Sequence, residues 1–139
     1  MATWDKVDRP AREFSVGRDL ASGAPLTGTD EHDIPDLEAK NELGLPVISP
    51  VSHVARSRNT KDPAEQIFRR VYSYQEGLGA TGLIFASYQA NIDRQFLPIQ
   101  ERLAQADLLN EWTSPVGSTV WAIPPGASEG GFVGQTLFM

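Results

Sequence analysis

The chain has 139 residues, of which 40% are hydrophobic and 22% are charged, and none is cysteine. A chain of this length buries roughly 70% of its unfolded surface, so one core forms without disulfides or a structural metal. The lack of cysteine excludes zinc ribbons, iron–sulfur clusters and thiol nucleophiles. No run reaches the roughly 18 apolar residues of a membrane span, and the N-terminus (MATWDKVDRP) lacks the apolar core of a signal peptide.

Acidic side chains outnumber basic ones by 18 to 12, which gives a net charge of −6. This balance argues against nucleic-acid binding, which depends on the neutralisation of phosphates. Residues 30–42 are strongly acidic, whereas basic side chains gather between residues 53 and 70. The basic positions are Arg56, Arg58, Lys61, Arg69 and Arg70. We expect this basic segment to receive a local anion, such as a carboxylate, rather than a polynucleotide.

The first part of the chain has little regular pattern. Residues 4–16 are predicted to form a short helix with Asp8 as its N-cap. Between residues 17 and 50, glycine and proline recur without a sustained period, and such a long irregular stretch is usually functional or disordered. We therefore divide the chain into an irregular part with one short helix, residues 1–50, and a more regular part, residues 51–139.

The regular part begins with two predicted strands. Residues 66–74 (QIFRRVYSY) are rich in aromatic and β-branched side chains, which favour strands. After a glycine-rich turn, residues 83–89 (LIFASYQ) form a nearly continuous apolar run of strand length. This pattern is typical of a central strand that is covered on both faces.

A helix and a third strand are predicted next. Asn91 is a good N-cap, and apolar residues then recur at alternating spacings of four and three, which predicts one buried helical face. These residues are Ile92, Phe96, Ile99, Leu103 and Ala106. Pro98 should kink or interrupt the helix, because it has no N–H to donate to the carbonyl four residues earlier. Residues 119–123 (TVWAI) are predicted to form a third strand.

The predicted order of strand, strand, helix and strand is most of a ferredoxin-like unit, an antiparallel sheet with helices on one face. A full unit needs another strand and helix, so this unit is incomplete. We therefore expect the α+β class, with an incomplete ferredoxin-like sheet in residues 51–139.

The two histidines suggest different chemistry. His32 lies among acidic residues, where a hard-metal site and a solvated loop are the two interpretations. His53 lies at the border between the two parts of the chain. It either caps or packs at an element boundary, or it serves as a ligand, because neutral imidazole commonly binds iron.

The roles of two arginines and of two acidic residues cannot be decided from the residues alone. Strict alternation puts either Arg69 or Arg70 on an apolar face of its strand, where it reaches solvent, lies at an interface or points into a pocket. Asp107 and Glu111 lie one helical turn apart, so they either form a carboxylate pair for acid–base chemistry or mark an exposed helix end.

Several segments, in order, resemble the C-terminal part of the dye-decolorizing (DyP-type) haem peroxidases, most of all the bacterial, often Tat-exported branch. They are EFSVGRDLASGAPLTG, PVSHVARSRN, QIFRRVYSYQEG, GLIFASYQANIDRQFLPIQERL, ADLLNEW and GSTVWAIPPG, and together they cover nearly the whole chain. The resemblance implies the C-terminal domain of a dimeric ferredoxin-like fold. It also implies binding of haem b (iron protoporphyrin IX), reduction of hydrogen peroxide, and oxidation of dyes or phenolic compounds.

The resemblance assigns catalytic roles. His53 corresponds to the proximal ligand of the haem iron, and Arg69 corresponds to the distal arginine on the peroxide side. Asp107 is the expected acceptor of the His53 imidazole N–H, with Glu111 as the alternative. A fixed guanidinium stabilises negative charge on the departing peroxide oxygen, and a carboxylate on the imidazole tunes the iron.

Further roles follow from the same resemblance. Arg56 or Arg58 is expected to pair with a haem propionate. Phe85 either forms part of the wall of the haem pocket or is an ordinary core residue. Trp112 and Trp121 are either electron relays to bulky substrates or ordinary core tryptophans.

The family's GxxDG motif, which supplies a distal aspartate, does not occur in this sequence, and neither does the family's N-terminal ferredoxin-like domain. We therefore expect a C-terminal fragment or one chain of a split enzyme, completed by an N-terminal polypeptide and acting on hydrogen peroxide and a bulky organic reductant. The alternative is a non-catalytic haem-binding or interaction module. A homo-oligomer is compatible with either, as is a cytoplasmic location or export through a leader on the N-terminal part.

Overall fold

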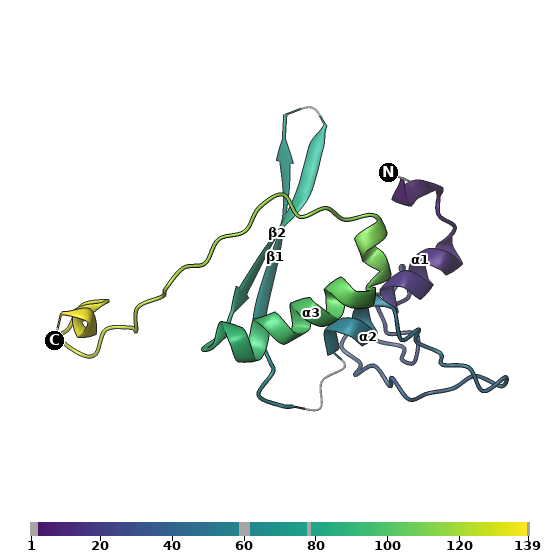
Figure 1. Ribbon diagram of the computed structural model, residues 1–139, viewed down its shortest axis with the longest axis horizontal. Helices are drawn as coiled ribbons and strands as arrows, with labels where there is room; N and C mark the ends of the chain where they lie inside the picture. Colours follow the sequence, from purple (N-terminus) through teal and green to yellow (C-terminus); the bar gives the residue numbers. More distant parts are fainter. Residues whose placement is uncertain (1–2, 59–61, 78, 139) are drawn as a thin grey trace.

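The α-helices cluster together, and a β-hairpin and a C-terminal segment project from them (Figure 1). The structure is a computed structural model that describes residues 3–58, 62–77 and 79–138. The helices are α1 (Arg9–Val16), α2 (His53–Arg58) and α3 (Leu97–Ala106), and the strands are β1 (Phe68–Glu76) and β2 (Ala80–Tyr88). This content confirms the α+β class.

Helix α1 begins as its sequence predicts and ends at a glycine. The Asp8 side chain accepts a hydrogen bond from the Ala11 N–H at 2.9 Å, which confirms Asp8 as the N-cap. Gly17 ends the helix in a left-handed conformation, with a φ of 86°. A Cβ atom at Gly17 would lie 2.9 Å from Ser52 Oγ, so glycine lets the end of α1 approach the start of α2.

Turns give defined structure to the irregular stretch after α1. Asp19 accepts hydrogen bonds from two backbone N–H groups of its turn at 3.0 and 2.7 Å, and Asp33 does the same at 2.7 and 2.9 Å. These bonds hold the pKa of each carboxyl below its usual range. Ala24 and Ile48, each 2% exposed, fix the stretch in the core. Of the two expectations for this stretch, disorder is therefore wrong.

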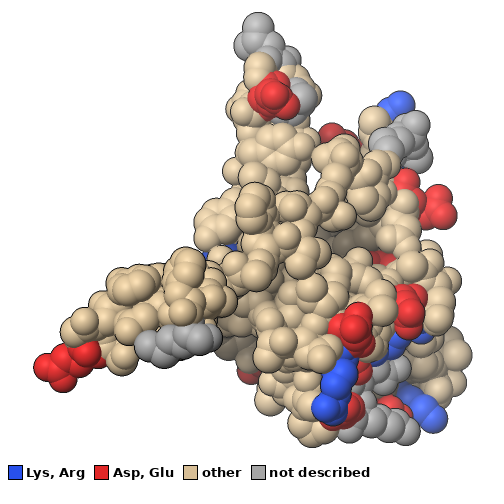
Figure 2. All heavy atoms as spheres, turned by 60° about the vertical axis from the view of Figure 1, so that its left-hand side comes forward, with Lys and Arg blue, Asp and Glu red and all other residues tan. Residues whose placement is uncertain are grey.

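Strands β1 and β2 form an antiparallel hairpin, in which Phe68 pairs with Tyr88 and Glu76 with Ala80. Both predicted strands are present, although their observed bounds differ by a few residues from the predicted ones. In Figure 2 the hairpin and the C-terminal segment are projections with few charges, whereas charged side chains gather on the helical part.

Both faces of the hairpin are open in this chain. Tyr72 and Ile84 lie on one face and Val71 and Phe85 on the other, and all four are 46–55% exposed. The prediction that the second strand is covered on both faces is wrong for this chain, because the described residues provide no layer over these side chains.

Helix α3 is the second of two helical segments. The first is a π-helical turn, η2 (Ile92–Phe96), whose N-cap Asn91 accepts a hydrogen bond from the Arg94 N–H at 2.9 Å. Pro98 lies in the first turn of α3, where its missing N–H costs nothing. The interruption predicted at Pro98 is therefore confirmed. Ile99, which is 7% exposed, fixes α3 in the core.

The C-terminal segment runs away from the helices as an extended chain (Figure 1). Residues 119–123 form no strand, and Val120, Trp121 and Ile123 are 69–79% exposed. A strand needs a neighbour for its backbone groups, and none of the described residues pairs with this segment. The predicted third strand is therefore wrong for this chain. In the parts that the structure describes, no helix is both long and apolar enough to cross a membrane.

Candidate functional site

His53 and Asp107 form the central contact of the candidate site. His53 is the first residue of α2, and Asp107 directly follows the last residue of α3. Imidazole Nδ1 lies 2.6 Å from carboxylate Oδ2. Because an ionised carboxylate only accepts hydrogen bonds, Nδ1 carries the proton, and in a neutral imidazole Nε2 then keeps a free lone pair.

The main chain also joins the two segments that carry this pair. The Leu108 N–H donates to the Val51 carbonyl at 3.1 Å, beside both site residues. Ser52, which is fully buried, accepts a hydrogen bond from the Ala55 N–H at 3.3 Å through its Oγ at the start of α2. The relative position of the imidazole and the carboxylate is therefore set by backbone as well as side-chain contacts.

Asp107 is oriented through both of its oxygens. It is 7% exposed, and its Oδ1 accepts a hydrogen bond from the Leu109 N–H at 3.0 Å, which caps the 3-10 helix η3 (Leu108–Glu111). Glu111, at the end of η3, is exposed. Asp107 and Glu111 do not share a helical face, because α3 ends at Ala106 and the backbone is extended at Asp107. Of the two candidate carboxylates, only Asp107 is hydrogen-bonded to the imidazole in the described structure.

The Arg56 guanidinium is engaged with α3. Its Nε and Nη2 atoms donate to the Arg102 carbonyl at 3.0 and 2.8 Å, and Nη2 also donates to Gln105 Oε1 at 3.2 Å. In return, Arg102 Nε donates to the Arg56 carbonyl at 3.1 Å, and Arg102 Nη1 forms an ion pair with Glu65. Of the two arginines expected near a propionate, Arg56 is thus already occupied by protein groups.

Arg58 and Arg69 line one open, polar hollow of about 360 Å³. The other residues around it are Arg18, Gly23, Glu31, His32 and Asp33. Loss of hydration, together with the nearby charges of Arg18 and Arg69, lowers the pKa of the Arg58 guanidinium. Three arginines and two acidic residues line the hollow, and within the described residues neither Arg58 nor Arg69 has an ion-pair partner, so both guanidinium groups are available to an anion. Lys61, another residue of the basic segment, lies outside the described residues.

Arg69 shares one face of the hairpin with Val71 and Phe85. Alternation along β1 puts Arg69 and Val71 on the same face, and Val71 pairs with Phe85 across the hairpin. Arg70 lies on the opposite face, where its guanidinium is 6.0 Å from the centroid of the Phe68 ring. The candidate distal arginine and the candidate pocket wall therefore face the same side of the sheet.

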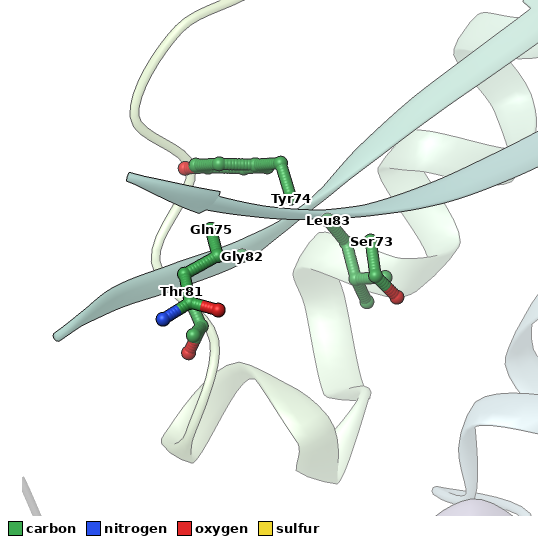
Figure 3. Close-up of a pocket in the computed structure, with 6 residues that line it drawn as sticks. All are labelled: Ser73, Tyr74, Gln75, Thr81, Gly82 and Leu83. Carbon is green, nitrogen blue, oxygen red and sulfur yellow. The ribbon is translucent and has the colours of Figure 1, made fainter. Parts of the chain in front are cut away.

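A second hollow, of about 500 Å³, lies near the tip of the hairpin (Figure 3). It is lined by Ser73, Tyr74, Gln75, Thr81, Gly82 and Leu83. The Tyr74 side chain lies on one side of the strands, and Ser73 and Leu83 point to the other (Figure 3). A Cβ atom at Gly82 would lie 2.6 Å from the Tyr74 ring, so the ring covers the glycine. Because its lining has no charged or metal-binding group, this hollow is distinct from the candidate site.

His32 and the tryptophans lie outside the histidine–carboxylate contact. The His32 side chain is 86% exposed and its Nε2 lies 3.3 Å from Glu31 Oε1. No group of three metal-ligating side chains gathers anywhere in residues 3–58, 62–77 and 79–138. Trp112 packs edge-on against Trp4 with ring centroids 4.9 Å apart, whereas Trp121 is 79% exposed and is not a core residue of this chain.

Comparison with known protein families shows the class of protein to which this chain belongs. Residues 1–128 match the family described as "Dyp-type peroxidase, C-terminal", and the chain belongs to this family. The family resemblance inferred from the sequence is thus confirmed.

Individual relatives agree with this assignment. The chain is 37% identical to the dye-decolorizing peroxidase of Thermobifida fusca over an alignment of 143 positions, which covers 99% of this chain and 33% of that protein. It superposes on the DyP-type peroxidase from Cellulomonas bogoriensis with a TM-score of 0.89 and 50% identity, covering 96% of this chain and 38% of that one. For the oxyferrous complex of DtpA from Streptomyces lividans, the TM-score is 0.86 at 33% identity, covering 98% of this chain and 39% of that one. The chain spans about a third of the length of the curated relatives it matches.

Sequence reasoning overlooked three residues near the site. Arg18 lines the hollow that contains Arg58 and Arg69, and Arg102 and Glu65 form the ion pair beside Arg56. The position of Arg102 in the sequence could have indicated its role, because it lies within α3 between the buried Ile99 and the site residue Asp107. A charge on the core side of a helix needs a partner, which predicts an ion pair but does not identify the partner.

Proposed function

We propose that this chain supplies the proximal part of a haem-dependent DyP-type peroxidase, which reduces hydrogen peroxide and oxidises dyes or phenolic compounds. The observation that carries the proposal is the 2.6 Å contact between His53 Nδ1 and Asp107 Oδ2. Family membership supports the reaction class, and the complete active site is proposed to need the remaining portion of the family fold.

The His53 imidazole fits the requirements of a haem ligand. The Asp107 carboxylate accepts the hydrogen bond from the protonated Nδ1, so the lone pair of Nε2 is directed away from that contact. Nε2 has no hydrogen-bond partner among the described residues, and the His53 side chain is 36% exposed. A ligand atom must be both unprotonated and reachable, and His53 Nε2 meets both conditions.

Haem, when bound, supplies the iron that cleaves the O–O bond of peroxide. Asp107 holds the proton at His53 Nδ1 and gives the imidazole more anionic character, which makes it a stronger donor to iron. Arg69, which has no ion-pair partner among the described residues, presents a positive charge that would stabilise negative charge on a peroxide oxygen.

Two further residues are proposed to contact the cofactor. Phe85 lies on the same sheet face as Arg69, and its half-exposed ring suits contact with a flat, apolar macrocycle. Arg58 is proposed to pair with a propionate, because it has no ion-pair partner among the described residues. Arg56 is the less suitable of the two, since Arg102 and Gln105 already accept from its guanidinium.

The N-terminal portion of the family fold is the proposed partner of this chain, on the same or a separate polypeptide. Support comes from the hairpin, which has apolar side chains on both faces and, among the described residues, no third strand paired along either edge. Covering those faces would remove apolar surface from water and close the space around Arg69 and Phe85. The distal aspartate of the GxxDG motif would come from the same portion.

The test pairs this chain with the portion of the Cellulomonas bogoriensis peroxidase that precedes the matched region. Haem is added, and peroxide-dependent oxidation of a dye is followed by absorbance. We expect turnover from the mixture and little from either part alone. Equal turnover by the 139-residue chain alone would contradict the need for a partner.

Neighbouring arginines provide a matched control. Arg69→Ala should lower the peroxide rate of the mixture by about 100-fold, the usual effect of removing a charge-stabilising donor. Arg70→Ala, on the opposite face, should lower it far less. Equal losses in both variants would contradict the role of Arg69.

A second candidate is a non-catalytic haem-binding module. It is favoured by the exposed position of Phe85, which no described residue covers to form a closed pocket wall. In that case haem binds through His53 but Arg69→Ala changes nothing, and the mixture oxidises no dye. His53→Ala should abolish axial ligation under both proposals, so peroxide turnover is the measurement that separates them.

A further inference from the structure

We infer that Arg102, together with Glu65 and Arg56, is a positioning residue that sets the hydrogen bond between His53 and Asp107. The inference rests on the proposed function, because the hydrogen bond matters only if His53 binds haem. The test of the inference uses no haem, so the inference and the proposed function can fail independently.

The contact between the two arginines is reciprocal. Arg56 donates to the Arg102 carbonyl at 3.0 and 2.8 Å, and Arg102 donates to the Arg56 carbonyl at 3.1 Å. Each guanidinium thus binds the main chain of the other helix. We call the contacts among Arg56, Arg102 and Glu65 the arginine clamp.

The clamp lies close to the site on both helices. Arg56 is three residues after His53 in α2, and Arg102 is five residues before Asp107 at the end of α3. A hydrogen-bonded helix is stiff over one turn, so fixing Arg56 to Arg102 also fixes the neighbouring turn that carries each site residue. A change of a few tenths of an ångström in the clamp would therefore pass directly to the 2.6 Å contact.

Glu65 explains why the clamp holds its geometry. The side chains of Arg102 and Glu65 are only 20% and 10% exposed. A partly buried guanidinium is costly without a counter-charge, and the carboxylate both compensates it and fixes the rotation of the guanidinium plane. Arg102 Nε is then directed at the Arg56 carbonyl. Lysine lacks this planar fork and cannot serve both partners in the same way.

The test follows the imidazole of His53 by NMR in the 139-residue chain labelled with ¹⁵N-histidine. Only His32 and His53 contribute signals, and His32→Ala identifies them. We expect one protonated Nδ1 at His53 and slow exchange of that proton with water. In Arg102→Gln the exchange should be about tenfold faster, the factor that corresponds to one hydrogen bond weakened by about 1.4 kcal/mol.

Two further variants separate positioning from general stability. Ile99→Ala removes a buried side chain from α3 but leaves the clamp atoms in place, so it should lower the unfolding midpoint without changing the His53 exchange rate. Arg102→Lys keeps the charge beside Glu65 but lacks the planar guanidinium, so it should also speed the exchange of the His53 proton. This variant replaces Arg102→Gln if Arg102→Gln does not fold. An unchanged exchange rate in folded Arg102→Lys, or equal acceleration in Ile99→Ala, would overturn the inference.

Discussion

Replacing Asp107 with asparagine tests the site at its central contact. The carboxylate serves two donors at once, His53 Nδ1 on Oδ2 at 2.6 Å and the Leu109 N–H on Oδ1 at 3.0 Å. The two donors lie on different oxygens of the carboxylate, and an asparagine in the same position presents its oxygen to one donor and its NH₂ group to the other. If the backbone N–H keeps the oxygen, the amide NH₂ faces His53 and Nδ1 must accept. The proton then moves to Nε2, the atom proposed to bind iron.

The expected losses follow from this change of tautomer. Asp107 is 7% exposed, so the lost charged hydrogen bond should cost about 1.5–3 kcal/mol of unfolding free energy, measured by urea denaturation. Haem affinity, measured by absorbance titration, should fall by about 10- to 100-fold, the usual effect of losing the partner of a metal-binding histidine. Glu111→Gln is the control, because Glu111 is exposed and should change neither quantity. An asparagine variant that keeps Nδ1–H and full haem affinity would refute the reasoning.

Three predictions concern the scaffold. Gly17→Ala should cost at least about 1–2 kcal/mol in urea denaturation, because φ is 86° and the new Cβ would lie 2.9 Å from Ser52 Oγ; an unchanged midpoint would contradict this. The Asp19 carboxyl has a pKa lowered by hydrogen bonds from its turn, so it contributes stability above its ordinary pKa of 3.8 that is lost as pH falls further. Asp19→Asn should therefore destabilise the chain at neutral pH but not at a pH far below 3.8. Equal destabilisation at the two pH values would contradict this prediction. Gly82→Ala should displace the Tyr74 ring, seen as shifted aromatic NMR signals, with His53 signals unchanged.

Local features of the fold could be predicted from the sequence because their causes are local. Asp8 and Asn91 cap helices through side-chain contacts to backbone three residues away, and Pro98 restricts only its own turn. Such interactions depend on residue types at fixed spacings. The same holds for the alternation that places Arg69 and Arg70 on opposite faces of β1.

Contacts between distant segments could not be predicted in this way. The apolar run at residues 83–89 indicates burial but not which layer provides it, and in this chain the described residues provide none. A strand at residues 119–123 would likewise need a neighbour that sequence patterns do not specify. The arginine clamp joins residues 46 apart through main-chain carbonyls, which carry no sequence signature.

The choice between Asp107 and Glu111 also required the structure. Both carboxylates lie near a helix end in the sequence, and the family resemblance favoured Asp107 without excluding Glu111. The extended backbone at Asp107 turns its side chain into the core, and Glu111 stays exposed. The orientation of Asp107 depends on where α3 ends, and sequence patterns define such helix boundaries poorly.

The central claim is that His53 Nε2 binds the haem iron, and pulsed EPR on the reconstituted ferric complex tests it most directly. Only this chain is labelled with ¹⁵N-histidine before it is combined with haem and the Cellulomonas bogoriensis portion. We predict ¹⁵N coupling to iron in the wild type and in His32→Ala, and none in His53→Ala. Coupling that survives in His53→Ala, or that is absent from the haem-loaded wild type, would contradict the account.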